Sequence, residues 1–270
     1  MEIIFLGTGT SHGVPSIDCM IEKHTRCRKD VCRLSEADSR HRRTRSSIIA
    51  AFKGVTVLVD ASMDFRVQVL RENIRSIDAA LITHSHADHI GGIPDLRSYD
   101  RSRGTPLPLY GSPESIRAIR SAFAYIFDPA AFIGGGIPSI DAIPVNEPFA
   151  LSGETITPIP VAHGALAGCR GYRIGPVVYI PDIKAIDAAG IETCRGADTL
   201  ILNCLREGPE HVSHLTLPES IDIARKIAPR QCFFTHLSHD IHYELDSARL
   251  DPWMHFAYDG LRISIGINDF

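Results

Sequence analysis

One short stretch restricts what this chain can fold into: THSHADHIGG, residues 83–92, directly after the apolar run IDAALI. Within six positions it places three imidazoles and one carboxylate, on His84, His86, Asp88 and His89. In a partly buried site such a cluster costs several kcal/mol through desolvation and repulsion. A bound cation reverses the sign of that interaction, so the stretch predicts a metal site at the end of a strand.

The rest of the chain alternates between expected strands and helices, which indicates an α/β (α+β) protein. Apolar runs bounded by glycine, proline and polar turns predict strands at 2–7, 46–52, 55–61, 79–83, 106–111, 156–163, 168–175, 177–182, 199–204, 231–236 and 260–265. Helices are expected at 65–72, after the N-cap Ser112, and after a Thr216/Glu219 capping box. We expect one domain, residues 1–270, with β-rich halves of about 1–149 and 150–270 whose two sheets pack face to face.

Further candidate ligands follow later strands, where functional groups gather in layered α/β folds. The expected ligands divide into two sets joined by one carboxylate: His84, His86 and His163 for the first ion, Asp88, His89 and His236 for the second, and Asp182 between them. Imidazole and carboxylate together suit zinc, manganese or iron rather than calcium or magnesium. Two ions about 3.5–4 Å apart hold a bridging hydroxide and clamp an anionic group. The alternative is separate surface or capping histidines.

The stretch THSHADHIGG resembles the H-x-H-x-D-H signature of the metallo-β-lactamase superfamily. FLGTG near the start and LVDAS before the signature follow that family's order, as do the three later ligands. The resemblance implies a four-layer αβ/βα sandwich with two divalent metals, manganese or zinc, in the active site. It also implies that Asp60, in LVDAS, supports the ligand loop from behind; the alternative is an ordinary residue of a strand-end turn.

A second group of residues lies in a polar excursion of about residues 16–45. Cys19, Cys27 and Cys32 lack a fourth ligand nearby, but His239 follows His236 by three positions, so a Cys3His structural zinc is expected. The arrangement is similar to the phosphoribosyl cyclic phosphodiesterases of the PhnP family, although the cysteines are spaced more widely. His24 is therefore an alternative ligand, and free thiols are the alternative to a zinc site. The other four of the seven cysteines are expected to be buried apolar residues.

The resemblance to phosphodiesterases also implies a catalytic histidine, His214, in EHVSHLTLPES. It would protonate the leaving oxygen or hold the phosphate, with a pKa near neutrality that needs no special tuning; a loop histidine without a catalytic role is the alternative. The expected reaction is hydrolysis of a small, cyclic ribosyl or nucleotide phosphodiester by a metal-bridging hydroxide, with Asp88 also catalytic. Alternatives are a tRNA 3′-end-processing type of endoribonuclease, a thioesterase or a metal-stabilised binding protein. The basic run 40–45 is either a solvated loop or a phosphate contact.

The overall composition limits the partners. The net charge is −4 and the sequence has no long basic arm, so nucleic acid is not expected as a partner. No apolar run approaches the roughly 18 residues of a membrane span, and the N-terminus does not resemble an export signal. We therefore expect a cytoplasmic protein with a small phosphodiester substrate. The sequence leaves the oligomeric state open, a homodimer included.

Overall fold

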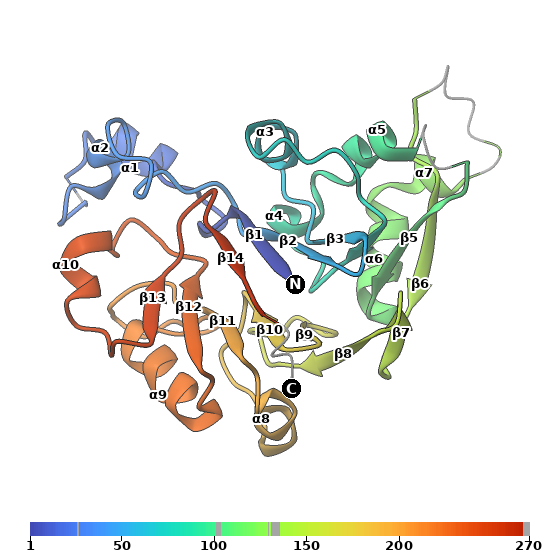
Figure 1. Ribbon diagram of the computed structural model, residues 1–270. Coiled ribbons are helices and arrows are strands. Elements are labelled where there is room, and N and C mark those ends of the chain that lie inside the picture. The colour runs from blue at the N-terminus through green and yellow to red at the C-terminus, as the bar shows by residue number, and fades with distance from the viewer. Residues whose placement is uncertain (26, 101–103, 129, 131–135, 267–270) are drawn as a thin grey trace.

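The computed structural model describes residues 1–25, 27–100, 104–128, 130 and 136–266. Two seven-stranded sheets pack against each other, and helices cover the outer side of each (Figure 1). The resulting helix–sheet–sheet–helix layers confirm the predicted αβ/βα sandwich. Within the described ranges, no helix combines the length and the apolar character that a membrane span requires.

The first sheet uses the N-terminal part of the chain, with one C-terminal strand added at its edge. Its order is β14-β1-β2-β3-β4-β5-β6, with the bounds β1 Glu2–Gly7, β2 Ser47–Phe52, β3 Val55–Val59, β4 Ala79–Leu81, β5 Leu107–Gly111, β6 Ile140–Pro144 and β14 Arg262–Ser264. Strands β3 to β6 run parallel to one another. Helices α3 (Phe65–Arg71) and α6 (Pro113–Ala122) pack on its outer face.

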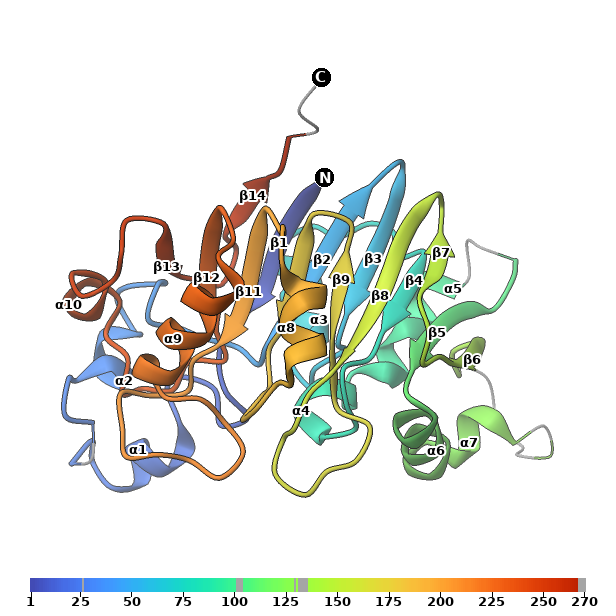
Figure 2. The same ribbon diagram turned by 90° about the horizontal axis from the view of Figure 1, so that it is seen from below.

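The second sheet comes from the C-terminal part of the chain. Its order is β13-β12-β11-β10-β9-β8-β7, with the bounds β7 Phe149–Leu151, β8 Glu154–Pro160, β9 Arg170–Ile174, β10 Val177–Ile180, β11 Thr199–Asn203, β12 Gln231–Thr235 and β13 Met254–Phe256. Strands β10 to β13 are parallel. Helices α8 (Ala188–Cys194) and α9 (Leu217–Ile227) lie in front of this sheet in Figure 2.

The strand β1 shows why both faces of the first sheet are apolar. Ile3 and Phe5 point to the core between the two sheets, whereas Ile4 and Leu6 point to the core under the helices, as the two-residue period of a strand requires. All four side chains are buried. A strand covered on both faces therefore appears in the sequence as a continuous apolar run.

Several elements differ from the sequence-based expectation. The helix expected at 113–127 is two helices, α6 and α7 (Ala124–Phe127), because Phe123 leaves the helical conformation with φ −119° and ψ 43°. The polar excursion contains two short helices, α1 (Ile17–Ile21) and α2 (Val31–Leu34), too short for a periodic signal. The glycine-rich segment 133–139, which resembles an active-site flap in sequence, begins outside the described residues.

Candidate active site

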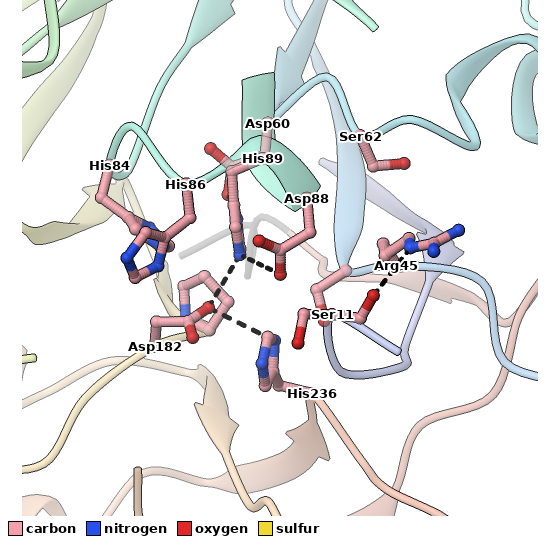
Figure 3. Close-up of polar contacts among 12 residues, drawn as sticks. Ser11, Arg45, Asp60, Ser62, His84, His86, Asp88, His89, Asp182 and His236 are labelled. Carbon is pink, nitrogen blue, oxygen red and sulfur yellow. Dashed lines mark hydrogen bonds and ion pairs between the residues drawn. The ribbon is translucent and has the colours of Figure 1, made fainter. Parts of the chain in front are cut away.

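The signature stretch lies where β4 ends and turns into the short helix α4 (Ala87–Ile90). His84 and His86 lie in the turn, and Asp88 and His89 are on α4 itself. The other expected ligands come from the second sheet, since His163 follows β8, Asp182 follows β10 and His236 follows β12. Figure 3 shows the side chains from both sheets pointing toward one another. The structure thus brings together all seven side chains that sequence reasoning selected, although their metal binding stays a prediction.

The first set consists of three imidazoles in T-shaped contact, with ring planes inclined by 62–80°. Nε2 of His84 lies 3.0 Å from Nδ1 of His86, and Nε2 of His163 lies 3.3 Å from the same Nδ1. These nitrogens lie within 4.8 Å of one another, which is close enough to share one ion. The burial of His84 lowers the pKa of its imidazole well below the ordinary value. It is thus held in the neutral form that binds metals.

The second set, Asp88, His89 and His236, lies close to the carboxylate of Asp182. Nε2 of His89 lies 3.3 Å from Oδ2 of Asp88 and 3.1 Å from Oδ2 of Asp182. Nδ1 of His236 lies 3.3 Å from that same oxygen of Asp182. Asp182 also approaches the first set, because its Oδ1 is 3.9 Å from Nε2 of His163. This places the carboxylate between the two sets, in the position expected of a bridging ligand.

Three buried atoms of the second set and Asp182 lie close to one another without forming a hydrogen bond: Nε2 of His89, Oδ2 of Asp182 and Nδ1 of His236. Buried polar atoms almost always form hydrogen bonds, so three unpaired polar atoms that face one another need an explanation. A divalent cation among them satisfies all three, and the donor set fits zinc or manganese. Burial would raise the pKa of Asp182, but His236 and His89 hold it well below its ordinary value, so the carboxylate is ionised.

Asp60 lies directly behind the signature stretch, as Figure 3 shows. It is fully buried; its Oδ2 is 2.8 Å from Nδ1 of His89, and it accepts hydrogen bonds from the backbone N–H and the hydroxyl of Thr83. Since the Thr83 hydroxyl donates to Asp60, it accepts from Nδ1 of His84, 3.0 Å away. One carboxylate therefore orients two imidazoles and leaves each Nε2 free for a metal.

The backbone at two of these positions is strained. Asp60 and His236 adopt left-handed conformations, with φ 65° and φ 61°. Such conformations are uncommon for residues other than glycine, and they cluster at functional sites.

His163 and His214 lie next to each other, with ring centroids 4.7 Å apart. Nδ1 of His163 donates to the carbonyl oxygen of Ser213 at 2.8 Å, which directs its Nε2 toward His86. Nδ1 of His214 lies 3.3 Å from Oδ1 of Asp182, and its ring stacks on His236 with centroids 4.8 Å apart. The sequence did not identify Ser213, which acts through its backbone and is marked only by its position next to His214.

The expected near-neutral pKa of His214 is wrong for the metal-free protein. Burial, together with His236, lowers the pKa of His214 to about 3. The ring is therefore neutral at physiological pH unless an anion binds beside it.

The polar excursion brings its cysteines to the loop after β12. The three thiols of Cys19, Cys27 and Cys32 and the imidazole of His239 lie within 4.8 Å of one another. Sγ of Cys32 is 3.4 Å from Nδ1 of His239, and all three cysteines are buried. His24 does contact Cys19, with Nδ1 3.3 Å from Sγ, but the four-donor group contains His239. The geometry fits the predicted tetrahedral Cys3His site.

The arginines of the run 40–45 bind protein atoms. Arg43 is fully buried and donates to the carbonyl oxygens of Ser238, at 2.6 Å, and Ile241, at 2.8 Å. Arg45 forms an ion pair with Asp64, with a shortest distance of 2.9 Å. Arg43 therefore ties the excursion to the loop that carries His239.

Comparisons with known proteins agree with this geometry. Residues 55–237 match the model of the beta-lactamase superfamily domain. A solved structure described as a new diphosphatase from the PhnP family shares 36% of the sequence with a TM-score of 0.86, over 98% of each chain. Zn²⁺-bound PqqB from Methylobacterium extorquens has the same fold, with a TM-score of 0.78, 24% identity and coverage of 98% of this chain and 100% of PqqB.

A further similarity is to a protein named octanoyltransferase from Porphyromonas gingivalis. The two are 35% identical over 270 residues, which is 98% of this chain and 52% of that protein. This chain thus spans about half the length of that relative.

Proposed function

The chain belongs to the beta-lactamase superfamily, a family of metal-dependent hydrolases, and on this premise we propose that it hydrolyses a small phosphodiester. The main support for the proposal is that seven side chains converge at one edge of the two sheets. Three of them have buried atoms without a hydrogen-bond partner among the described residues. The similarity to a PhnP-family diphosphatase over 98% of the chain supports a phosphate-containing substrate over other substrates.

In this proposal the chain's own residues hold the ions and move the protons. The first set, His84, His86 and His163, and the second set, Asp88, His89 and His236, would hold one cation each, and Asp182 would be shared by both. When bound, the two cations supply an acidified water molecule and positive charge for the phosphate oxygens. In their neutral forms, His84 and His89 would be kept by Asp60 in the tautomer that leaves Nε2 unprotonated. Without metal, burial would lower the pKa of His89, but Asp88 and Asp182 hold it well above its ordinary value, so a cation must displace a proton from this ring.

His214 is the proposed general acid. Hydrolysis adds the hydroxyl of water to phosphorus and a proton to the oxygen that departs. The neutral ring of His214 gains a proton when the phosphate anion binds, since an adjacent negative charge raises the pKa of an imidazole. Its contact with Asp182 keeps the ring next to the two ligand sets.

A second candidate function is hydrolysis of an acyl thioester. It is suggested by the 35% identity to the protein named octanoyltransferase, because that name refers to the transfer of an acyl group. Since that protein is about twice as long, its name can refer to the half that this chain lacks. A tRNA-processing nuclease has no comparable support, and the net charge of −4 disfavours a polyanionic substrate.

One experiment separates these candidates. Protein purified without added metal is analysed for metal content by mass spectrometry and assayed with bis(p-nitrophenyl) phosphate and octanoyl-coenzyme A, each with and without manganese. We expect about three metals per chain and turnover of the phosphodiester alone. Turnover of the thioester alone would replace the proposal by the second candidate, and a filled site that is inert toward both substrates would reject both.

A further inference from the structure

A third cluster of potential metal ligands contains no residue of the active site or of the cysteine group. It consists of His41, near the end of the polar excursion, and of His242 and Glu244, at the start of helix α10 (Tyr243–Ser247). One donor atom from each residue lies within 4.8 Å of the other two. Helix α10 lies next to the excursion (Figure 1), so the cluster joins residues up to 203 positions apart in the sequence.

The carboxylate of Glu244 contacts both imidazoles. Its Oε2 is 3.1 Å from Nε2 of His41 and 3.3 Å from Nδ1 of His242. The rings themselves are in T-shaped contact, with centroids 4.6 Å apart and planes inclined by 71°. Two imidazoles and one glutamate form the protein ligand set of zinc sites that keep an open fourth position. The cluster therefore has the donors of a three-ligand site for zinc or a similar cation.

The nitrogen of His242 that faces the carboxylate also caps α10. The backbone N–H of Leu245 donates to this Nδ1, at a distance of 3.3 Å. A nitrogen that accepts this hydrogen bond carries no proton, so it and Oε2 of Glu244 are two acceptors that face each other. A cation between them replaces this repulsion by two favourable contacts. The cation competes with the helix cap for the lone pair of Nδ1, which weakens its binding.

The ring of His41 is available as a ligand in its neutral form. It is buried, and among the described residues its Nδ1 has no hydrogen-bond partner. No contact at Nδ1 therefore fixes the tautomer, and Nε2 can direct its lone pair toward the cluster. Burial, together with Arg43 and His242, lowers the pKa of His41, although Glu244 opposes this shift. At pH 7 the imidazole is therefore neutral, as metal binding requires.

The charges around the cluster oppose a cation only in part. Two guanidiniums are nearby: Arg40, whose Nη2 lies 2.6 Å from Oε1 of Glu244, and Arg43, which acts on His41. Arg40 also pairs with Asp38, so two carboxylates balance the two positive charges. The other ionisable neighbours are Tyr243, whose ring contacts the guanidinium of Arg40, and Asp246, which pairs with Lys29 and Arg249. We expect the guanidiniums to make this site weaker than the cysteine group, and hence exchangeable.

We propose that His41, His242 and Glu244 form a further metal site, which binds a divalent transition cation such as zinc. A cation held by these three residues joins the end of the excursion to α10 and stabilises that contact. The site contains no residue of the proposed catalytic machinery. Because it is exchangeable, its ion is lost on purification and is not among the metals expected in protein purified without added metal.

Zinc itself is the probe for this site. Protein is loaded with zinc and desalted, its metal content is measured by mass spectrometry, and more zinc is then titrated by calorimetry. We expect one additional ion per chain and a higher midpoint of thermal unfolding. His242→Asn removes the imidazole but keeps a residue that caps helices well, and Glu244→Gln removes the carboxylate. Each variant should weaken the additional binding at least about tenfold, the lower limit even for residues that only orient a ligand. His255→Gln, on β13, is the matched control and should bind zinc like the wild type.

The absence of an additional ion in a large excess of zinc would overturn the proposal. So would an additional ion that both variants bind as tightly as the wild type does, because that ion would then lie elsewhere on the protein. If His242→Asn is less stable, Glu244→Gln gives the same test at a more exposed side chain, 42% of which is accessible. Neither readout involves hydrolysis, so failure of the proposed phosphodiesterase activity would leave this test intact.

Discussion

The carboxylate of Asp60 lies 2.8 Å from Nδ1 of His89, and both side chains are fully buried. This pair links strand β3 to helix α4, and the same carboxylate reaches His84 through the hydroxyl of Thr83. The partner of a ligand histidine sets which ring nitrogen is protonated and where the ring points. The strained backbone at Asp60 is thus explained by its position beneath two candidate ligands.

Asp60→Asn should therefore weaken the metal site without unfolding the protein. We expect a loss of about 10- to 100-fold in metal affinity, since an amide oxygen orients imidazole less strongly than a carboxylate does. Competition titration with a chromogenic chelator measures the affinity. Asp198→Asn, at the surface pair with Arg230, serves as the control. Unchanged affinity in Asp60→Asn would contradict the positioning role.

His214→Ala should lower kcat by about 10²- to 10⁴-fold while the metal content stays unchanged, because the residue is proposed to supply a proton and is not a proposed ligand. Steady-state kinetics and mass spectrometry measure the two quantities on the same sample. His255→Gln, which changes an exposed histidine on β13, is the matched control. A fall in metal content equal to the fall in kcat would instead make His214 a ligand.

Zinc binding to the cysteine group should release about two protons or more per ion at pH 7. Burial and the neighbouring Cys32 raise the pKa of Cys19 to about 12, and burial also raises the pKa of Cys27, so both thiols are protonated without metal. Because protons compete with zinc for these thiols, the apparent affinity should weaken as the pH falls.

Calorimetric titration of zinc-depleted protein in buffers of different ionisation enthalpy counts these protons. Cys194→Ala changes a buried cysteine outside the group and should leave the count unchanged. Zinc uptake without proton release would rule out thiolate ligation.

Arg43→Met should lower the free energy of unfolding by about 2–4 kcal/mol, because it leaves two buried carbonyl oxygens without donors. The affected carbonyls belong to Ser238 and Ile241, on both sides of His239. Chemical denaturation of the zinc-loaded protein measures the change. Arg42→Met, whose guanidinium donates to carbonyl oxygens at a more exposed site, should cost less than about 1 kcal/mol. Equal losses of unfolding free energy in the two variants would show that the contacts of Arg43 stabilise the protein no more than those of Arg42.

Features that depend on neighbouring residues were predictable from the sequence. The apolar runs predicted β1 to β5 and most of the second sheet, since a strand covered on both faces needs continuous apolar residues. The capping box of α9 is present, with the Glu219 carboxylate accepting from the backbone N–H of Thr216 at 2.7 Å. The short strands β6, β7 and β13 were not predicted. They contain only three to five residues, too few to show a clear hydrophobic period in the sequence.

The sequence by itself determined the signature stretch, since side chains within six positions must converge wherever the strand ends. It also determined the fold, through the order of strands and helices and the resemblance of its motifs. Only the tertiary structure decided which distant groups meet: Ser213 behind His163, Arg43 beneath the loop of His239, and His214 beside Asp182. The physical reason is that such contacts join segments up to 207 positions apart, as between Cys32 and His239, and that separation leaves no local pattern.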